Sequence, residues 1–497
     1  MRASGILMPV FSLPSRYGIG SFSKSAYQFV DMLKKAGQKY WQILPLCPTS
    51  YGDSPYQSFS TYAGNPYFID LDQLIEEKLL TRKECQACDF GDDPQDIDYG
   101  KLYENRFKLL RKAYERANVG EDQEFEAYRR ENAWWLDDYA LFMAVKDRFD
   151  GVAWNEWAED IRLRWSNAMD YYRRELYYEI EFYSYLQFVF MKQWKKLKNY
   201  ANINGIEIIG DIPIYVAFDS ADAWANPELF QFDAENLPTA VAGCPPDGFS
   251  ADGQLWGNPL YRWDYHRETG FDWWIRRIAY CSELYDVVRI DHFRGFDEYY
   301  SIPYGDTTAR NGHWEKGPGI ALFEAAKNRL GELNIIAEDL GYITDSVKKL
   351  VADSGFPGMK VLEFAFDSRE KSDYLPYTYE KNSVVYTGTH DNETIAGWYA
   401  GLDKSDLKMC TDYMNIDRIP GKEYHWDFIR LAMLSVSDLC VIPIQDYLGL
   451  DNRARINHPS TLGTNWRWRL AKGQLNASLL KEIREMTRIS GRLQNGE

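Results

Sequence analysis

Eight short apolar segments, each with the composition of a buried strand, recur along the 497 residues and alternate with helix-like stretches. Parallel strands that follow one another need a crossover connection, and that connection is usually a helix. Eight such units predict an α/β fold, a closed (β/α)8 TIM barrel rather than an open sheet. The predicted strands are residues 4–10, 40–46, 206–211, 287–291, 334–338, 359–364, 384–390 and 439–444.

The barrel is expected to span residues 1–497 as one catalytic domain and to carry two insertions. Residues 71–183 are charged and rich in aromatic side chains, a pattern typical of amphipathic helices, so they predict a helical insertion. Residues 217–265 are dense in proline and glycine. This composition predicts an irregular, loop-rich insertion on the side of the barrel where the strands end.

The bulk composition excludes some classes of partner. The formal net charge is −17, and both nucleic acids and anionic membranes need a basic surface, so neither is expected to bind. No apolar run reaches the roughly 18 residues of a membrane-spanning helix. Seven scattered cysteines suit free thiols in a reducing compartment, so we expect a cytoplasmic protein. The aromatic content of 16% suits sugar stacking and core packing equally.

Acidic residues stand at the ends of three predicted strands, as Asp291, Glu338 and Asp391. Active sites of TIM barrels lie at the C-terminal ends of the strands, so these side chains are expected to converge. The chain has no glycine-rich loop of the kind that binds phosphates. Three converging carboxyl groups therefore predict either chemistry at a sugar carbon or a bound metal ion.

Glycoside chemistry needs one ionised carboxylate and one protonated carboxyl group. Arg289 lies on the same side of its strand as Asp291 and is expected to lower the pKa of that carboxyl, making Asp291 the nucleophile. The apolar run before Glu338 is expected to raise its pKa, which suits the acid, although Asp339 is an alternative for that role. Asp391 would bind sugar hydroxyls and stabilise the positively charged transition state.

Other interpretations of these residues stay open. Arg289 and Asp291 could form an ordinary buried ion pair with no chemical role. His292 and His390 could bind a metal together with the carboxyl groups, but no paired His-x-His or His-x-x-x-His spacing supports this. We therefore predict no metal and no cofactor.

A set of motifs spread over nearly the whole chain resembles one known family. The motifs are SLPSRYGIGSF, GDSPYQSFSTYAGNPYFI, GDIPIYV, PPDGFSADGQLWGNP, VVRIDHFRG, IIAEDLG, TGTHDNET and RINHPSTLGTNWRWR. They are similar to those of the 4-α-glucanotransferases called amylomaltases or disproportionating enzymes, glycoside hydrolase family 77. The resemblance implies a TIM barrel with inserted, largely helical subdomains and no separate C-terminal β-domain.

The resemblance also implies roles for particular residues. Asp291 would be the nucleophile, Glu338 the acid and base, and Asp391 the stabiliser of the transition state, while Arg289 and His390 would border the reacting sugar. The loop 244–252 would lie over the active-site cleft. The other glucan-binding residues implied by the resemblance are Ser54, Tyr56, Asp211, Gln254, Trp256 and Asn457.

The family pattern is broken at three places. Cys244 replaces an aliphatic residue, Gly248 replaces an aromatic one, and GTNW stands where GNW is usual. The missing aromatic residue bears on how tightly long glucans are held. None of the three predicted catalytic positions is affected.

The implied reaction is retaining transfer of an α-1,4-glucan segment to the 4-hydroxyl of an acceptor glucan or glucose. Expected partners are glucose and α-1,4-glucans from maltodextrin, starch or glycogen, bound by a monomer or a homodimer. An amylase-like hydrolase with the same residues and a non-catalytic glucan-binding protein are the alternatives.

Overall fold

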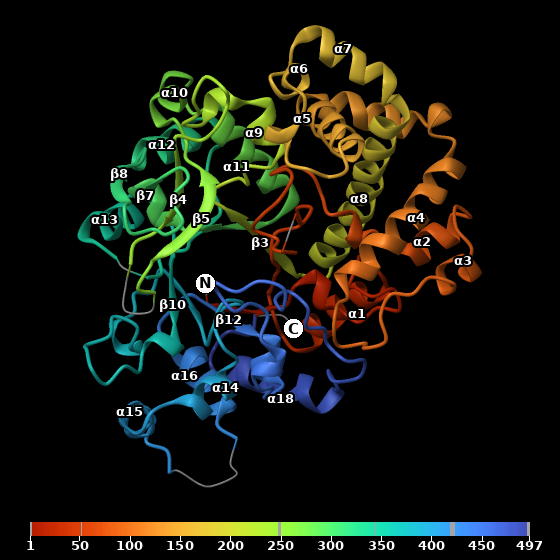
Figure 1. Cartoon of the computed structure of the whole chain (residues 1–497). Coiled ribbons are helices and arrows are strands. Elements are labelled where there is room, and N and C mark those ends of the chain that lie inside the picture. The colour runs from red at the N-terminus through yellow and green to blue at the C-terminus, as the bar shows by residue number, and fades with distance from the viewer. Residues whose placement is uncertain (1, 51, 247–249, 342, 418–422, 495–497) are drawn as a thin grey trace.

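Eight parallel strands form the centre of the molecule in the computed structural model, which describes residues 2–50, 52–246, 250–341, 343–417 and 423–494 (Figure 1). Each predicted strand segment supplies one of them. The strands are β1 (Ala3–Leu7), β2 (Tyr40–Gln42), β3 (Glu207–Pro213), β6 (Val287–Asp291), β9 (Ile335–Ala337), β10 (Gly358–Val361), β11 (Ser383–Tyr386) and β12 (Leu439–Pro443).

These strands close into a barrel in the order β1-β12-β11-β10-β9-β6-β3-β2, so the predicted fold class is confirmed. The seam pairs the first and last strands, from Ala3 opposite Leu439 to Leu7 opposite Pro443. Strands buried on both faces need continuous apolar runs, which explains why the sequence pattern was clear. The barrel is filled by a cluster of Leu7, Ile209, Val287, Ile336, Met359, Val361, Val384, Tyr386 and Val441.

A second, antiparallel sheet with the order β5-β4-β7-β8 stands beside the barrel. Its strands are β4 (Ala240–Cys244), β5 (Gln254–Pro259), β7 (Glu298–Pro303) and β8 (His313–Lys316). The prediction that residues 217–265 lack regular structure is therefore wrong, because β4, β5 and α9 (Ala221–Ala225) lie within that range and α10 (Trp263–Glu268) begins in it.

Glycine is part of the reason that β4 and β5 can pair. A Cβ atom on Gly243 would stand 2.1 Å from the main-chain oxygen of Gln254, so this close approach of two backbones excludes a side chain. The same glycine-rich composition disguised the strands in the sequence. Pairing with β7, more than 50 residues later in the chain, is not visible in a local pattern.

Helices make up most of residues 71–183, and they stand to one side of the barrel in Figure 1. Asp98 and Asp122 cap two of the long helices by accepting hydrogen bonds from first-turn N–H groups. The helices are α2 (Leu71–Glu76), α3 (Arg82–Gln86), α4 (Tyr99–Ala117), α5 (Gln123–Arg148), α6 (Glu159–Arg162), α7 (Ser166–Glu175) and α8 (Tyr177–Ile203), which leads into β3.

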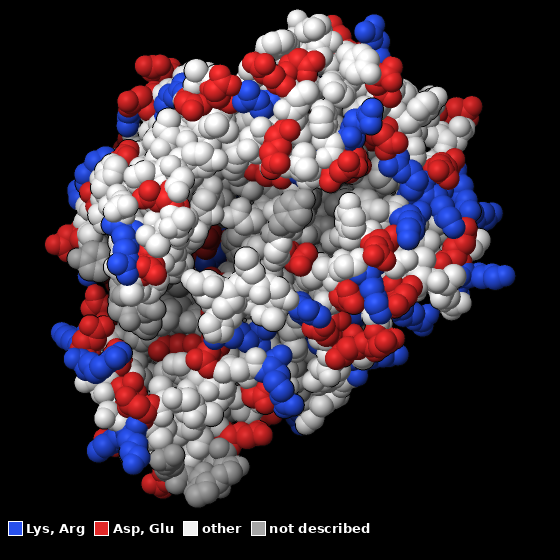
Figure 2. All heavy atoms as spheres, viewed as in Figure 1, with Lys and Arg blue, Asp and Glu red and all other residues white. Residues whose placement is uncertain are grey.

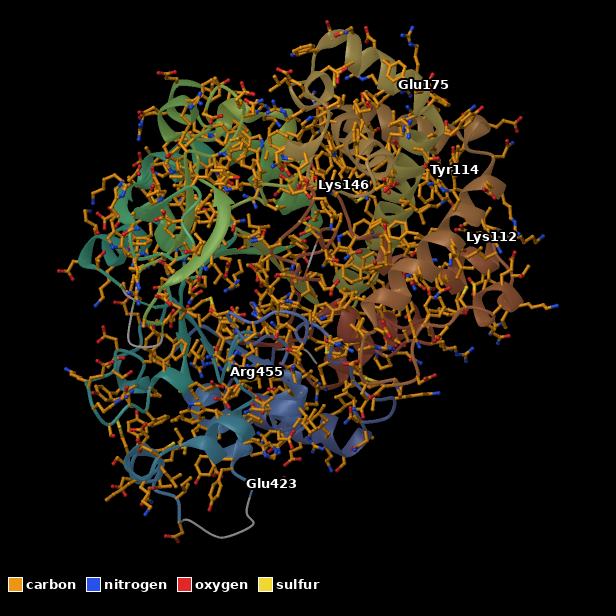
Figure 3. All side chains as sticks on the ribbon, in the orientation of Figure 1. Lys112, Tyr114, Lys146, Glu175, Glu423 and Arg455 are labelled. Atoms are coloured by element: carbon orange, nitrogen blue, oxygen red, sulfur yellow. The ribbon has the colours of Figure 1, made fainter. Side chains whose placement is uncertain are left out.

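A buried ion pair ties these helices to the barrel. Lys146, on α5 and labelled in Figure 3, lies 2.5 Å from a carboxyl oxygen of Asp219 in the loop after β3. Asp219 also accepts a hydrogen bond from the main-chain N–H of Trp154. The helical segment is thereby joined to a loop at the strand ends.

The remaining helices mostly cover the barrel between its strands. None of the helices in the described ranges is both long and apolar enough to cross a membrane. The remaining helices are α1 (Lys24–Lys35), α11 (Asp272–Leu284), α12 (Ile320–Leu330), α13 (Asp345–Ser354), α14 (Ile395–Gly401), α15 (Lys404–Met414), α16 (His425–Leu434), α17 (Ile444–Tyr447) and α18 (Ala477–Ile489).

Candidate active site

A cleft of about 580 Å³ opens where the barrel strands end. Figure 2 shows the surface hollowed near its middle, with acidic atoms inside the hollow. A larger cleft of about 910 Å³, beside α1 and α2, contains none of the predicted site residues. The predicted residues that line the smaller cleft are Ser54, Tyr56, Gln254, Trp256, Asp291, His390, Asp391 and Asn457.

Arg289 connects two carboxyl groups at the floor of this cleft. Its Nη2 atom lies 3.0 Å from Oδ1 of Asp291, so the predicted side-by-side placement on β6 is confirmed. Its Nη1 atom donates to both oxygens of Asp211 on the neighbouring strand β3, at 2.8 and 2.6 Å. Asp211 is fully buried and also accepts a hydrogen bond from the hydroxyl of Tyr56, at 2.7 Å. Asp211 and Arg289 thus lie beneath the cleft rather than in its lining.

The predicted lowering of the pKa of Asp291 is wrong. Burial raises the pKa of Asp291 well above its ordinary value, Arg289 opposes the rise, and the charges of Glu338 and Asp211 add to it. The side chain is 29% exposed and lines the cleft. Arg289 cannot offset the burial because Asp211 shares its charge.

Glu338 directly follows β9 and stands beside the end of β6. Its Oε2 atom accepts a hydrogen bond from the main-chain N–H of His292 at 2.7 Å, and Oε1 accepts one from Leu340 at 2.9 Å. His292 has a left-handed φ of 54°, which is uncommon outside glycine and turns its N–H toward the glutamate. Burial raises the pKa of Glu338, as predicted, while Arg289 and the two N–H donors act against the rise.

Asp291 and Glu338 form one titrating pair. Ile290 and Ala337 are partners in the register of β6 and β9, so the two acids follow on adjacent strands. The charge of Glu338 raises the pKa of Asp291, because two negative charges in a buried place are unfavourable. One proton held by the pair leaves one carboxyl charged and one neutral.

Asp339, the alternative acid, is placed differently. Its Oδ1 atom accepts a hydrogen bond from the main-chain N–H of Met359 at 2.7 Å. The side chain of Asp339 is therefore hydrogen-bonded to the start of β10, whereas that of Glu338 is hydrogen-bonded to the residue after Asp291.

Asp391 lies in the turn that follows β11. Asn457 donates to its Oδ1 atom at 2.7 Å, and Nε2 of His390 lies 3.4 Å from the same oxygen. Burial lowers the pKa of His390, which favours the neutral imidazole. The ring of Tyr56 stacks on that imidazole with a centroid distance of 5.1 Å and an angle of 12°. The turn thus presents an acid beside a flat, apolar surface.

Further parts of the cleft wall come from β5 and from the loop after β2. Oε1 of Gln254 accepts a hydrogen bond from the indole N–H of Trp256 at 3.1 Å. The indole stands edge-on to His292, with ring centroids 4.9 Å apart. Oγ of Ser54 accepts a hydrogen bond from the main-chain N–H of Tyr56 at 3.2 Å, which holds the loop.

Sequence reasoning missed some residues of the cleft. Trp466 lines it, with its ring centroid 5.8 Å from that of Tyr56 and 6.0 Å from that of His390. The aromatic residue in the GTNW motif was the available signal. Tyr215 and Asn258 also line the cleft. They lie in the motifs GDIPIYV and PPDGFSADGQLWGNP, and this membership was the available signal for them.

The structure describes only some of the positions that depart from the family pattern. Cys244 ends β4 and forms no disulfide. Gly248 lies outside the described residues, as do its two neighbours in the loop 244–252. Within the described part of the chain, no three His, Cys, Asp or Glu side chains are grouped so that they could hold a metal ion.

A TIM barrel with carboxyl groups around an aromatic-walled cleft at its strand ends is the build of a carbohydrate-active enzyme. The family model described as 4-alpha-glucanotransferase, glycoside hydrolase 77, matches residues 8–475. A 4-alpha-glucanotransferase of Clostridium butyricum is 49% identical over 487 residues, which cover 98% of this chain and 100% of the relative. The chain therefore belongs to the 4-alpha-glucanotransferase family, and it is an enzyme of that activity acting on glucans.

Solved structures agree with this assignment. The amylomaltase from Streptococcus agalactiae, determined in complex with acarbose, superposes with a TM-score of 0.96 at 44% identity, covering 99% of this chain and 100% of the other. The amylomaltase from Corynebacterium glutamicum has a TM-score of 0.78 at 19% identity, covering 99% of this chain and 75% of its own, and so shares the fold.

Proposed function

We propose that this enzyme transfers α-1,4-glucan segments by a retaining double displacement, with Asp291 as nucleophile, Glu338 as acid and base, and Asp391 as stabiliser of the transition state. One observation carries the proposal. Asp291 and Glu338 end adjacent strands, and the N–H of the residue after Asp291 binds the carboxyl group of Glu338. A pair that shares one proton supplies the two charge states that the reaction needs.

In the first step, ionised Asp291 attacks the anomeric carbon while protonated Glu338 gives its proton to the departing glycosidic oxygen. The C–O bond to the leaving chain breaks and a bond from carbon to Asp291 forms. Positive charge grows on the sugar ring in the transition state. Asp391, oriented by Asn457, faces the cleft where that charge develops.

In the second step, Glu338 removes the proton from the 4-hydroxyl of an acceptor, and the oxygen displaces Asp291 with retained stereochemistry. Transfer exceeds hydrolysis only if the acceptor is positioned better than water. Stacking on Trp256 and Trp466, which line the cleft, supports such positioning.

The substrate contacts are also part of the proposal. His390, Ser54, Tyr56, Gln254, Trp256 and Asn457 would contact the glucan from the cleft wall. Asp211 and Arg289 would act from beneath, by holding Tyr56 and Asp291.

We also propose that the two insertions serve the cleft. We assign residues 217–265 to a subdomain bordering the cleft, since Gln254 and Trp256 line it. Residues 71–183 would form a helical subdomain supporting the loop after β3 through Lys146 and Asp219.

The cellular setting follows from the same features. We propose a cytoplasmic monomer or homodimer that acts on maltodextrin, starch or glycogen fragments and on glucose. All seven cysteines are outside disulfides, which supports a reducing compartment. We further propose that acarbose binds in the cleft, since the similar amylomaltase of Streptococcus agalactiae was determined with it.

Incubation of the pure protein with maltotriose tests the proposal. A ladder of longer oligosaccharides together with glucose supports transfer, whereas maltose and glucose alone would identify a hydrolase. The variant Asp291→Asn should lose turnover but still bind maltotriose in calorimetry, and turnover at the wild-type rate would exclude this nucleophile. A crystal structure with acarbose should show the Asp291 and Glu338 carboxyl groups about 5 to 5.5 Å apart, the spacing of a retaining pair.

A further inference from the structure

The turn that carries His390 and Asp391 rests on buried acids that the proposed mechanism does not use. Asp446, in α17 directly after β12, accepts hydrogen bonds from the hydroxyl of Thr387 and the main-chain N–H of Ile395. These two residues mark the beginning and the end of the turn. Asp446 is 1% exposed, so it secures both ends from within the protein.

Glu363, which follows β10, lies under the middle of the same turn. Its main-chain N–H donates to the oxygen of Thr387 at 3.2 Å. A Cβ atom on Gly388 would stand 2.6 Å from Oε1 of Glu363 and 3.1 Å from Cβ of Asn392. The carboxyl group is therefore packed against the backbone of the turn, with no space for a side chain between them.

Asn392 connects Glu363 to the turn. Its Oδ1 atom accepts hydrogen bonds from the main-chain N–H of Thr389 at 2.9 Å and from the Thr389 hydroxyl at 2.8 Å. Cβ of Asn392 and Oε1 of Glu363 both pack against Gly388, within 3.1 Å of the place that an added Cβ atom would take, so the two side chains meet there. Because Oδ1 is occupied by donors, the NH₂ group is the part of Asn392 left to donate, and its interaction with the glutamate lowers the pKa of Glu363.

The charge around Glu363 favours its neutral form. Burial raises the pKa of Glu363 well above its ordinary value, with Asp446 from α17 and Glu393 from the turn adding to the rise. Arg455 and the hydrogen bond from Asn392 act in the opposite direction. A neutral carboxyl group has nearly the shape of a carboxamide, so glutamine is a close substitute here.

Arg455, which is labelled in Figure 3, also holds the turn. The guanidinium donates to the main-chain oxygen of Asp391 at 2.7 Å and to that of Asn457 at 2.8 Å. Asn457 in turn donates to the Asp391 carboxyl group at 2.7 Å. Glu363 and Arg455 therefore both contact the turn.

We propose that Glu363 is a positioning residue for the transferase reaction: through Asn392 it fixes the turn in the place where Asn457 orients the carboxyl group of Asp391. The inference rests on the role proposed above for Asp391. Glu363 does not line the cleft, so it acts on the reaction only through the turn.

The expected signature is a loss of kcat without a matching rise in KM. Asp391 is proposed to act in the transition state, and a displacement of about 1 Å in a catalytic group costs about a hundredfold in rate. Ser54, Gln254 and Trp256, which also line the cleft, lie outside the turn, so ground-state binding should change less than the rate. A role limited to stability would lower Tm and leave the kcat of the folded fraction unchanged.

Four variants test the proposal on the full-length enzyme with maltotriose as donor and acceptor. Glu363→Ala removes the support and should lower kcat about tenfold or more, with KM within about twofold of wild type. Glu363→Gln keeps the acceptor for Asn392 and should recover kcat to within about threefold. Asn392→Ala should resemble Glu363→Ala, and the double variant should lose little more, because the two residues act through one contact. Glu370→Ala, an exposed acid on the following segment, is the matched control and should behave as wild type.

Three results would overturn the inference: equal kcat losses in Glu363→Ala and Glu363→Gln, additive losses in the double variant, or an unchanged kcat in Glu363→Ala. If Glu363→Ala does not fold, Asn392→Ala and Glu363→Gln still decide the question. Crystal structures of wild type and Asn392→Ala give a readout that does not depend on activity, since the Asn457–Asp391 hydrogen bond should be broken in the variant. If this hydrogen bond is broken in Asn392→Ala but the wild-type enzyme shows no transfer, only the proposed function fails. If the hydrogen bond is intact in Asn392→Ala, only this inference fails.

Discussion

Nη1 of Arg289 lies 2.8 and 2.6 Å from the two carboxyl oxygens of Asp211, beneath the floor of the cleft. The same guanidinium reaches Asp291 through Nη2. One positive charge therefore serves two acids, and the pKa of Asp291 depends on a residue that does not line the cleft.

Asp211→Asn should move the acidic limb of the pH profile to lower pH. The charge of Asp211 raises the pKa of Asp291, so removal of that charge lowers the pKa. Asp291 is then the one charged acid that Arg289 still pairs with. Asp291 must be ionised to attack, so kcat/KM should persist further into acid. The measurement is kcat/KM for maltotriose against pH. Asp353→Asn removes one charge at an exposed site and should not move the limb. A shift to higher pH in Asp211→Asn would contradict the shared-charge account.

Glu338→Gln should lower kcat on maltotriose about a hundred- to ten-thousandfold, the usual contribution of general acid catalysis. A donor with a fluoride leaving group needs no proton, so maltosyl fluoride should still form the covalent intermediate. Mass spectrometry of the trapped protein measures this. Asp339→Asn is the comparison. The carboxyl group of Asp339 accepts a hydrogen bond from the main-chain N–H of Met359, so it should contribute little to proton transfer. Equal losses on both donors would argue against Glu338 as the acid.

Trp256→Ala should weaken glucan binding with a small effect on the chemical step. Stacking on an aromatic ring is worth about 0.5–1.5 kcal/mol, so KM should rise about three- to tenfold. Trp256→Phe should recover most of the loss. The exposed Trp165, on the helical segment, offers a control whose replacement by alanine should leave KM unchanged. A KM that does not respond to Trp256→Ala would remove this residue from the substrate contacts.

Asp222 should make folding stability depend on pH. Burial raises its pKa to about 6, and it accepts a hydrogen bond from the main-chain N–H of Thr61. A carboxyl group with a raised folded-state pKa binds more protons when folded than when unfolded. The contribution of this proton to folding stability is thus complete below the unfolded-state pKa, which is near 4. It is lost as the pH rises through the folded-state pKa of about 6.

Asp222→Asn removes this titration. The free energy of unfolding of the variant, measured with urea, should therefore rise relative to that of wild type between about pH 4 and pH 7, by up to about 3 kcal/mol. Unfolding curves of both proteins across that range provide the test. A constant difference between the two proteins would show that Asp222 has the same pKa in both states.

The sequence was informative where local pattern and local chemistry coincide. Buried parallel strands need unbroken apolar runs, so all eight barrel strands could be located, and the acids at their ends marked the cleft. The strands β4 and β5 could not be found, since Gly243 and the prolines around them hide a pairing made with distant β7.

The electrostatics of the site were harder to predict for a related reason. Arg289 is two residues from Asp291, so the sequence could show that the two side chains pair. Asp211 comes from another strand, and the sequence could not show that it also pairs with Arg289. Glu363 and Arg455 likewise reach the turn of Asp391 through folding alone. Arg455 opens the motif RINHPSTLGTNWRWR, but the motif does not indicate which residue it contacts.

Closure of the barrel by β1 and β12 has a consequence for how this chain is made. During synthesis the first strand leaves the ribosome early and can pair with β2 on one edge, but its other edge has no neighbour until residues 439–443 appear. Until then the nascent sheet presents open hydrogen-bonding groups to other chains. Assembly of the ring is thus a late event, and slowed translation would lengthen the period in which aggregation competes with it.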